Sequence, residues 1–130
     1  MLLINISDEL TFRDFKKADS CARTLEIRVN YLQNDGNELR LPDGITFLTF
    51  DTFRHLSLKD GAIDAEKSLI IIDEVDSLLF QTPHDFEGLQ RVLTPFSKLI
   101  GLTGSELKEF HMQAAQSITQ ATTIKFTAVN

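Results

Sequence analysis

The sequence predicts an α/β fold, a single three-layer domain built on a largely parallel sheet of about five or six strands. Strand-like segments alternate with helical patterns along the whole chain, which is typical of such folds. The run 69–72 is unbroken and apolar, as in a strand covered on both faces by helices. No repeat, linker or low-complexity stretch divides residues 1–130, so we expect one domain.

The first half of the chain supplies clear local signals. Residues 2–6 predict a short opening strand, and Ser7 is an N-cap for a helix that runs to about Arg23. Apolar residues alternate with polar ones over 25–31, which indicates a second strand. Further along, the pattern predicts turns at 34–37 and 42–44, a strand at 45–50 and a short helix at 51–56.

The second half continues the alternation. After the apolar strand 69–72, apolar residues recur at helical spacing from Phe86, and Pro95 ends or kinks that helix. A short strand follows at 99–103, and Gly104-Ser105 opens another helix. Alternating residues at 122–129 predict a closing strand.

Composition narrows the class of protein. Of the 130 residues 42% are hydrophobic and 25% charged, as in ordinary soluble domains. The net charge of −6 argues against a strong nonspecific attraction to nucleic acid or anionic membranes. Cys21 has no partner for an internal disulfide and is expected in or near the core. The chain has no signal peptide pattern and no transmembrane segment, so we expect a cytoplasmic protein.

The acidic pair Asp73-Glu74 is the main candidate for chemistry. It follows the apolar strand 69–72, and open α/β sheets bind ligands at the carboxyl ends of their strands. One carboxylate of such a pair holds Mg²⁺ in nucleotide triphosphatases, while the other orients the attacking water. The alternative is a buried strand that ends in a solvated acidic turn, and this segment alone leaves both open.

Three segments in order resemble the first motor domain of superfamily 2 helicases and DEAD-like ATPases, a P-loop NTPase (RecA-like) fold. They are the strand and helix at 45–56, Asp73-Glu-Val-Asp76 after its strand, and Leu102-Thr-Gly-Ser105 about thirty residues later. The motif Asp73-Glu-Val-Asp-Ser77 looks most like the acidic motif of the SecA preprotein translocase family. The resemblance extends from the opening strand, which matches the element after that family's phosphate-binding helix, to the last strand.

The resemblance implies roles for individual residues. Asp73 would support the Mg²⁺ of bound ATP, and Glu74 would activate water. Asp76 would join the contacts that couple the acidic motif to its neighbours. The segment Thr103-Gly104-Ser105 would contact the nucleotide site and link its state to a partner domain, while Thr49 matches a position near the nucleic-acid track of helicases.

Simpler structural roles compete with these assignments. Asp76 and Ser77 would equally start and cap a helix that contains Leu78. Thr103-Gly104-Ser105 is also an ordinary strand-to-helix turn with Ser105 as N-cap. The spacing of the three histidines indicates neither a metal site nor a catalytic site; they are His55, His84 and His111.

The sequence departs from the family in one respect, the phosphate-binding loop. That loop needs the pattern Gly-x-x-x-x-Gly-Lys-Ser/Thr, and none of the six glycines here precedes a lysine. We therefore expect no Mg²⁺–ATP binding and no hydrolysis by this chain alone. ATP hydrolysis would need the loop and a second motor domain supplied by a longer chain.

These observations leave two main functions. The chain is either part of a motor or a non-enzymatic interaction module on the same scaffold. As part of a motor, it is a fragment or degenerate relative of a SecA-type protein that moves preproteins, or alternatively part of a nucleic-acid helicase. An unrelated α/β domain that binds a divalent cation is a third reading. Partners would be the rest of the motor, another protein, or a second copy that joins through an open sheet edge. Because the family's phosphate-loop strand is missing, we expect 122–129 or another chain to pair with 99–103.

Overall fold

The computed structural model describes residues 1–36, 38–75, 77, 78 and 86–102. It contains a five-stranded sheet in which every neighbouring pair is parallel, in the order β2-β3-β1-β4-β5. The strands are β1 (Leu2–Asn5), β2 (Val29–Tyr31), β3 (Ile45–Thr49), β4 (Ile70–Ile72) and β5 (Leu99–Gly101). The predicted α/β class with a parallel sheet is confirmed at this level.

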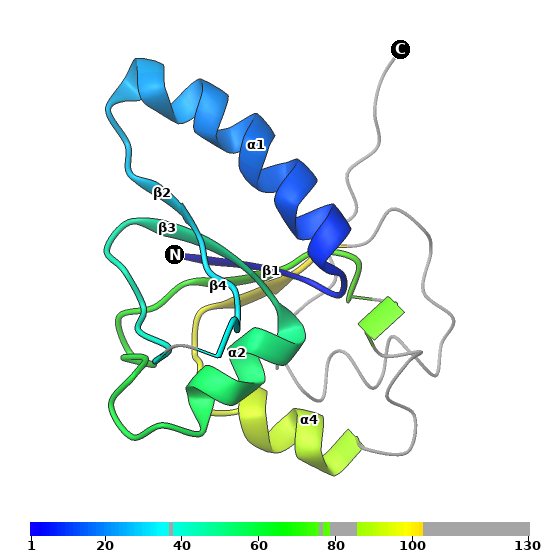
Figure 1. Ribbon diagram of the computed structural model, residues 1–130. Helices are drawn as coiled ribbons and strands as arrows, with labels where there is room; N and C mark the ends of the chain where they lie inside the picture. The colour runs from blue at the N-terminus through cyan, green and yellow to red at the C-terminus, as the bar shows by residue number, and fades with distance from the viewer. Residues whose placement is uncertain (37, 76, 79–85, 103–130) are drawn as a thin grey trace.

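Helices lie on both faces of the sheet (Figure 1). They are α1 (Asp8–Leu25), α2 (Phe50–Ser57) and α4 (Phe86–Leu93). The connection from β1 through α1 to β2 runs toward one edge, whereas the connections through α2 and α4 run toward the other. Because such crossovers are right-handed, α1 covers one face while α2 and α4 cover the opposite face.

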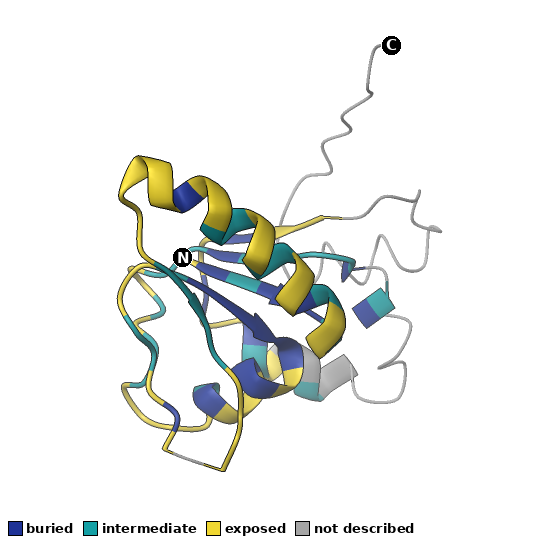
Figure 2. Ribbon diagram, turned by 45° about the horizontal axis from the view of Figure 1, so that its top comes forward, coloured by how far each residue is buried: buried dark blue, intermediate teal, exposed yellow. Residues whose placement is uncertain are grey.

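The first helix begins and ends where its capping residues place it. The Ser7 hydroxyl accepts a hydrogen bond from the Leu10 N–H at 3.2 Å, as predicted for an N-cap. At the other end Glu26 adopts a left-handed conformation with φ 55° and donates its N–H to the Ala22 carbonyl. Its outward side is exposed along much of its length, as the yellow segments of this helix in Figure 2 show.

Two predicted boundaries were wrong. Leu25 belongs to α1 and not to a strand, because the helix continues to the Glu26 cap. Leu25 is 67% exposed, so the alternation of apolar residues at 25 and 27 did not mark a buried face. Phe50 opens α2 instead of ending β3, because Thr49 caps the helix through a hydrogen bond from the Thr52 N–H at 3.2 Å.

The main core lies between the sheet and the α2–α4 layer. Strand residues of β1, β3, β4 and β5 pack there against side chains from both helices. Those fully buried, at 0% or 1% exposure, are Leu2, Ile4, Leu48, Phe53, Leu56, Ile70 and Ile72. Burial of this apolar set supplies the main stabilisation of the fold.

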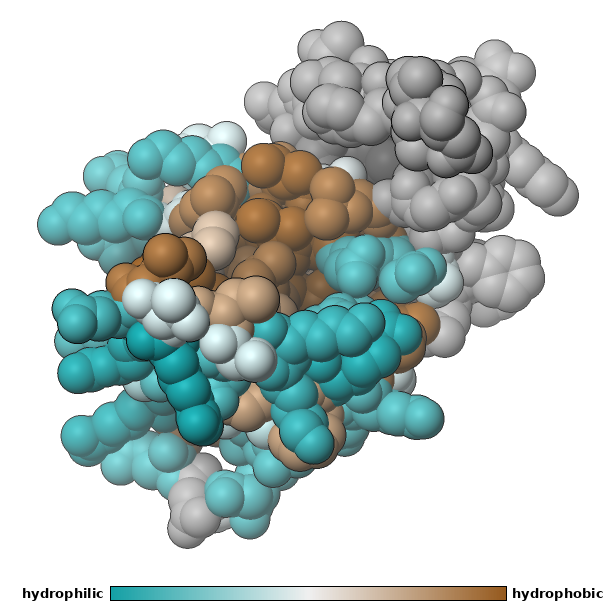
Figure 3. Space-filling model, turned by 90° about the horizontal axis from the view of Figure 1, so that it is seen from above, coloured by the Kyte–Doolittle hydropathy of each residue, from teal (hydrophilic) through white to brown (hydrophobic). Residues whose placement is uncertain are grey.

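Cys21 and the phenylalanines of β3 and α2 lie in different environments. Cys21 is exposed on α1, so the core position expected for it was wrong, because the buried stripe of α1 passes through Thr11 and Ala22 instead. Phe47, Phe50 and Phe53 are all buried, so none of them marks an exposed interface. The α1 side of the molecule nevertheless gathers apolar side chains at its surface (Figure 3).

The last expected elements lie outside the described residues. These are the helix opened by Gly104-Ser105, the strand 122–129 and its pairing with 99–103. Within the described part of the chain, Pro95 follows the end of α4, as expected, and β5 begins at Leu99.

Candidate functional site

The acidic pair lies at the carboxyl edge of the sheet, next to its central strand. The Asp73 N–H donates to the Ile4 carbonyl at 2.8 Å, which extends the pairing of β4 with β1 by one residue. Both carboxylate side chains are half-buried. The structure therefore places Asp73 and Glu74 at the edge where parallel α/β sheets bind ligands.

The backbone at the pair is unusual. Glu74 has φ 55°, a left-handed conformation that L-residues other than Asn and Asp adopt infrequently. Asp73 supports this turn, because its Oδ1 accepts a hydrogen bond from the Glu74 N–H at 3.0 Å. Strained conformations of this kind concentrate at functional sites, although tight turns also contain them.

A helical turn follows directly. The Glu74 carbonyl accepts hydrogen bonds from the N–H groups of Ser77 and Leu78, at 3.0 and 3.3 Å. Val75 and Leu78 point into the core, at 7% and 3% exposure. Ser77 thus lies inside the turn rather than at its start, and Asp76 lies outside the described residues.

The acidic loop is bonded to the strand that leads to the predicted Thr-Gly-Ser motif. The Leu102 N–H donates to the Ile72 carbonyl at 2.8 Å, and the Val75 N–H donates to the Leu102 carbonyl at 3.0 Å. Thr103, Gly104 and Ser105 lie outside the described residues. The described chain therefore reaches the acidic loop one residue before that motif begins.

Two buried polar residues end neighbouring strands at this edge of the sheet, and the sequence analysis did not single out the first of them, Asn5. Asn5 ends β1 and pairs in register with Thr49 at the end of β3, and they are 3% and 7% exposed. The signal in the sequence was an asparagine that ends an otherwise apolar strand. The resemblance places Thr49 near a nucleic-acid track; in the structure its hydroxyl caps α2 and bonds the Thr52 hydroxyl at 3.1 Å.

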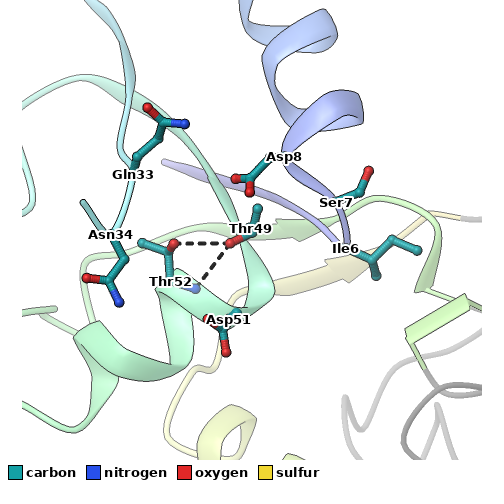
Figure 4. Close-up of a pocket in the computed structure, with 8 residues that line it drawn as sticks. All are labelled: Ile6, Ser7, Asp8, Gln33, Asn34, Thr49, Asp51 and Thr52. Atoms are coloured by element: carbon teal, nitrogen blue, oxygen red, sulfur yellow. Dashed lines mark hydrogen bonds between the residues drawn. The ribbon is translucent and has the colours of Figure 1, made fainter. Parts of the chain in front are cut away.

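A polar hollow of about 310 Å³ opens between the carboxyl ends of β1 and β3. Its lining comes from the loops after β1, β2 and β3 (Figure 4). The chain leaves β1 and β3 toward opposite faces of the sheet, which is the place where open α/β sheets bind ligands. The N-termini of α1 and α2 favour an anion there, but Asp8 and Asp51 in the same lining oppose one.

The donor set limits what metal the site could hold. Within the described residues no group of three or more His, Cys, Asp or Glu side chains is arranged to bind a metal ion. Mg²⁺ needs only one or two carboxylates when water and phosphate oxygens complete its shell. Asp73 and Glu74 match that number of carboxylates, whereas the described part of the chain holds no ligand set for an all-protein metal cage.

The histidines add no catalytic group to the candidate site within the described residues. His55 is exposed and its Nδ1 lies 2.8 Å from the Asp51 carbonyl, while His84 and His111 lie outside the described residues.

Among the helices in the described ranges, none has the length and apolar character required to cross a membrane. No protein-family model, no curated protein and no solved structure matches this chain.

Proposed function

We propose that this chain carries the acidic half of the nucleotide site of a DEAD-like motor domain of SecA type. The observation that supports this function best is the position of Asp73 and Glu74, beside the central strand β1 and bonded through Val75 to the end of β5. In this proposal the complete motor is cytoplasmic, and hydrolysis drives movement of a polypeptide rather than of nucleic acid.

Asp73 is the metal-binding carboxylate in this proposal. Its Oδ1 accepts the Glu74 N–H, which orients the carboxylate and leaves Oδ2 for a cation. Mg²⁺ held with a nucleotide would neutralise phosphate charge at this point. Two carboxylates in adjacent positions also divide the work, since Glu74 remains the acceptor for a proton of the attacking water.

The left-handed conformation of Glu74 has a direct consequence for its side chain. With φ 55° the chain turns sharply between Asp73 and Val75. Val75 is buried, and its N–H is bonded to the Leu102 carbonyl. The Glu74 carboxylate is thereby carried on a short turn anchored on both sides, which suits a group that must hold a water in a fixed position.

Hydrolysis requires parts that the printed sequence does not supply. A phosphate-binding loop contributes backbone N–H groups and a lysine to the triphosphate, and no Gly-x-x-x-x-Gly-Lys pattern is present. We therefore propose that ATP is hydrolysed only when this loop and a second motor domain are provided by a longer chain or a partner. For the chain by itself we expect no tight Mg²⁺–ATP complex.

The test is metal binding by the folded chain. Mn²⁺ replaces Mg²⁺ as a paramagnetic probe, and its binding is followed by electron paramagnetic resonance of the free ion. We expect weak binding that Asp73→Ala removes. Asp60→Ala is the matched control, because Asp60 is an exposed carboxylate in a turn remote in sequence from the acidic pair.

Two results would count against the proposal. Equal Mn²⁺ affinity in the wild type and Asp73→Ala would show that the acidic pair does not bind the cation, which favours the non-enzymatic scaffold. Calorimetry that detects micromolar Mg²⁺–ATP binding to the chain would contradict the requirement for an added phosphate-binding loop.

A further inference from the structure

Asn5 carries a buried donor without an acceptor. Its side chain is 3% exposed, and its Oδ1 accepts the Ile6 N–H at 2.7 Å, which fixes the orientation of the amide. The Nδ2 atom is buried and has no hydrogen-bond partner among the described residues. Buried polar groups without partners are rare, and each one calls for an explanation.

The sheet register places this amide next to the acidic pair. Ile4 pairs with Ile72 on β4, and the Asp73 N–H bonds to the Ile4 carbonyl, so Asp73 follows β4 at the level of Asn5. Neighbouring strands lie about 5 Å apart, and paired residues project to the same face. The register therefore predicts that the Asn5 amide lies next to Asp73, the first residue after β4.

The other flank offers a less suitable acceptor. Thr49 pairs with Asn5 on β3, but its hydroxyl accepts the Thr52 N–H and bonds the Thr52 hydroxyl, at 3.2 and 3.1 Å. Among the described residues, the hydrogen bond that Asp73 accepts is the one from the Glu74 N–H to Oδ1. An ionised carboxylate oxygen accepts more strongly than a hydroxyl already in use, so Asp73 Oδ2 is the acceptor that matches Asn5 Nδ2.

We propose that Asn5 is a positioning residue for Asp73, whose carboxylate accepts a hydrogen bond from Asn5 Nδ2 when the acidic site is loaded with a cation. This inference rests on the proposed function. Oδ1 stays on the Glu74 N–H and Oδ2 turns toward Asn5, and each oxygen keeps a lone pair for the cation. Carboxylates that bind metals are commonly held by such outer hydrogen bonds, whose loss weakens metal affinity about 10- to 100-fold.

Three substitutions separate positioning from a purely structural role. Asn5→Leu has a similar volume but removes the donor, and we expect it to weaken Mn²⁺ binding about tenfold or more. Asn5→Thr restores a hydroxyl donor and should recover most of the affinity. Thr46→Val is the matched control. Thr46 Oγ1 is also buried without a hydrogen-bond partner in the described part of the chain, but Thr46 pairs with Leu2 at the other end of β1.

A second readout does not need the metal affinity. Proton–nitrogen nuclear magnetic resonance spectra are recorded with diamagnetic Mg²⁺ in place of Mn²⁺. The resonances of the Asn5 side-chain amide should move when Asp73 is changed to Ala. They should stay in place with Asp60→Ala. This comparison uses an intact Asn5, so it remains valid if Asn5→Leu does not fold.

The outcomes distinguish this inference from the function on which it rests. If Asp73→Ala abolishes Mn²⁺ binding while a folded Asn5→Leu retains full affinity, the positioning role is wrong and the acidic site stands. If the Asn5 resonances do not respond to Asp73→Ala, the hydrogen bond is likewise refuted. If the resonances respond but Mn²⁺ affinity never depends on Asp73, the two side chains are in contact without a cation, and both the nucleotide-site function and the positioning role in cation binding are wrong.

Discussion

Gly101 provides a sharp test of how the acidic loop is held. A Cβ at this position would lie 3.2 to 3.3 Å from three atoms of Val75, namely Cβ, Cγ1 and Cγ2. Such distances are shorter than ordinary van der Waals contact, so Val75 must move by a few tenths of an ångström in Gly101→Ala. Val75 is the residue that follows Glu74, and therefore any displacement reaches the acidic pair.

The magnitude follows from two opposing terms. Overpacking a fitted contact costs about 1–3 kcal/mol. Replacing glycine by alanine at a position without positive φ gains about 0.4–1 kcal/mol, because the unfolded chain loses freedom. Val75 has little room to yield, since its N–H is bonded to Leu102 and its side chain is 7% exposed. We therefore expect Gly101→Ala to lower the free energy of unfolding by about 1 kcal/mol.

A double-mutant cycle isolates the contact. Val75→Ala removes both methyl groups and should by itself cost about 2 kcal/mol. In the double variant the new methyl group at position 101 occupies part of the space that Val75 vacates. We expect the double variant to lose about 1 kcal/mol less unfolding free energy than the two single losses added together. Urea denaturation followed by circular dichroism measures all four proteins.

The functional consequence is measured on the same proteins. Gly101→Ala should weaken the Asp73-dependent binding of Mn²⁺, and the added Val75→Ala should restore part of it. Strict additivity of the unfolding free energies would refute the steric reasoning. Unchanged Mn²⁺ affinity in a destabilised Gly101→Ala variant would show that the contact with Val75 does not position the acidic pair.

Two further predictions concern other parts of the fold. Thr46→Val should raise the free energy of unfolding by about 1 kcal/mol, because it removes, at nearly constant volume, a buried hydroxyl that has no partner among the described residues. Urea denaturation measures this change, and a loss of stability would contradict the prediction. Burial and the Asp8 carboxylate raise the pKa of Tyr31, the single tyrosine, above its ordinary value of 10.0, and Asp8→Asn should lower it in an ultraviolet titration of the phenolate. Because the Tyr31 phenol ionises at a lower pH in the unfolded chain, its contribution to stability is present below pH 10.0 and is lost as the pH rises through the folded-state pKa. If the Asp8→Asn variant titrates like the wild type, the Asp8 carboxylate is not a cause of the raised pKa.

The sequence by itself predicted the features that depend on neighbouring residues. The cap at Ser7 and the turn at Gly44 follow from local hydrogen bonding and backbone freedom, and both are present, with Gly44 at φ 103°. The apolar run before Asp73 predicted a buried strand, because a segment covered on both faces needs no polar side. Periodicity was less reliable near Leu25, where capping by Glu26 set the boundary instead.

Only the tertiary structure decided which distant residues share the candidate site. The position of β1 between β3 and β4 is set by packing and register among segments far apart in the chain, so no local pattern reports it. That register brings Asn5 beside Asp73. The contact between Gly101 and Val75 likewise depends on how closely β5 approaches the acidic loop. The sequence determined which residues could carry the chemistry, whereas long-range pairing of parallel strands decided which groups lie near them.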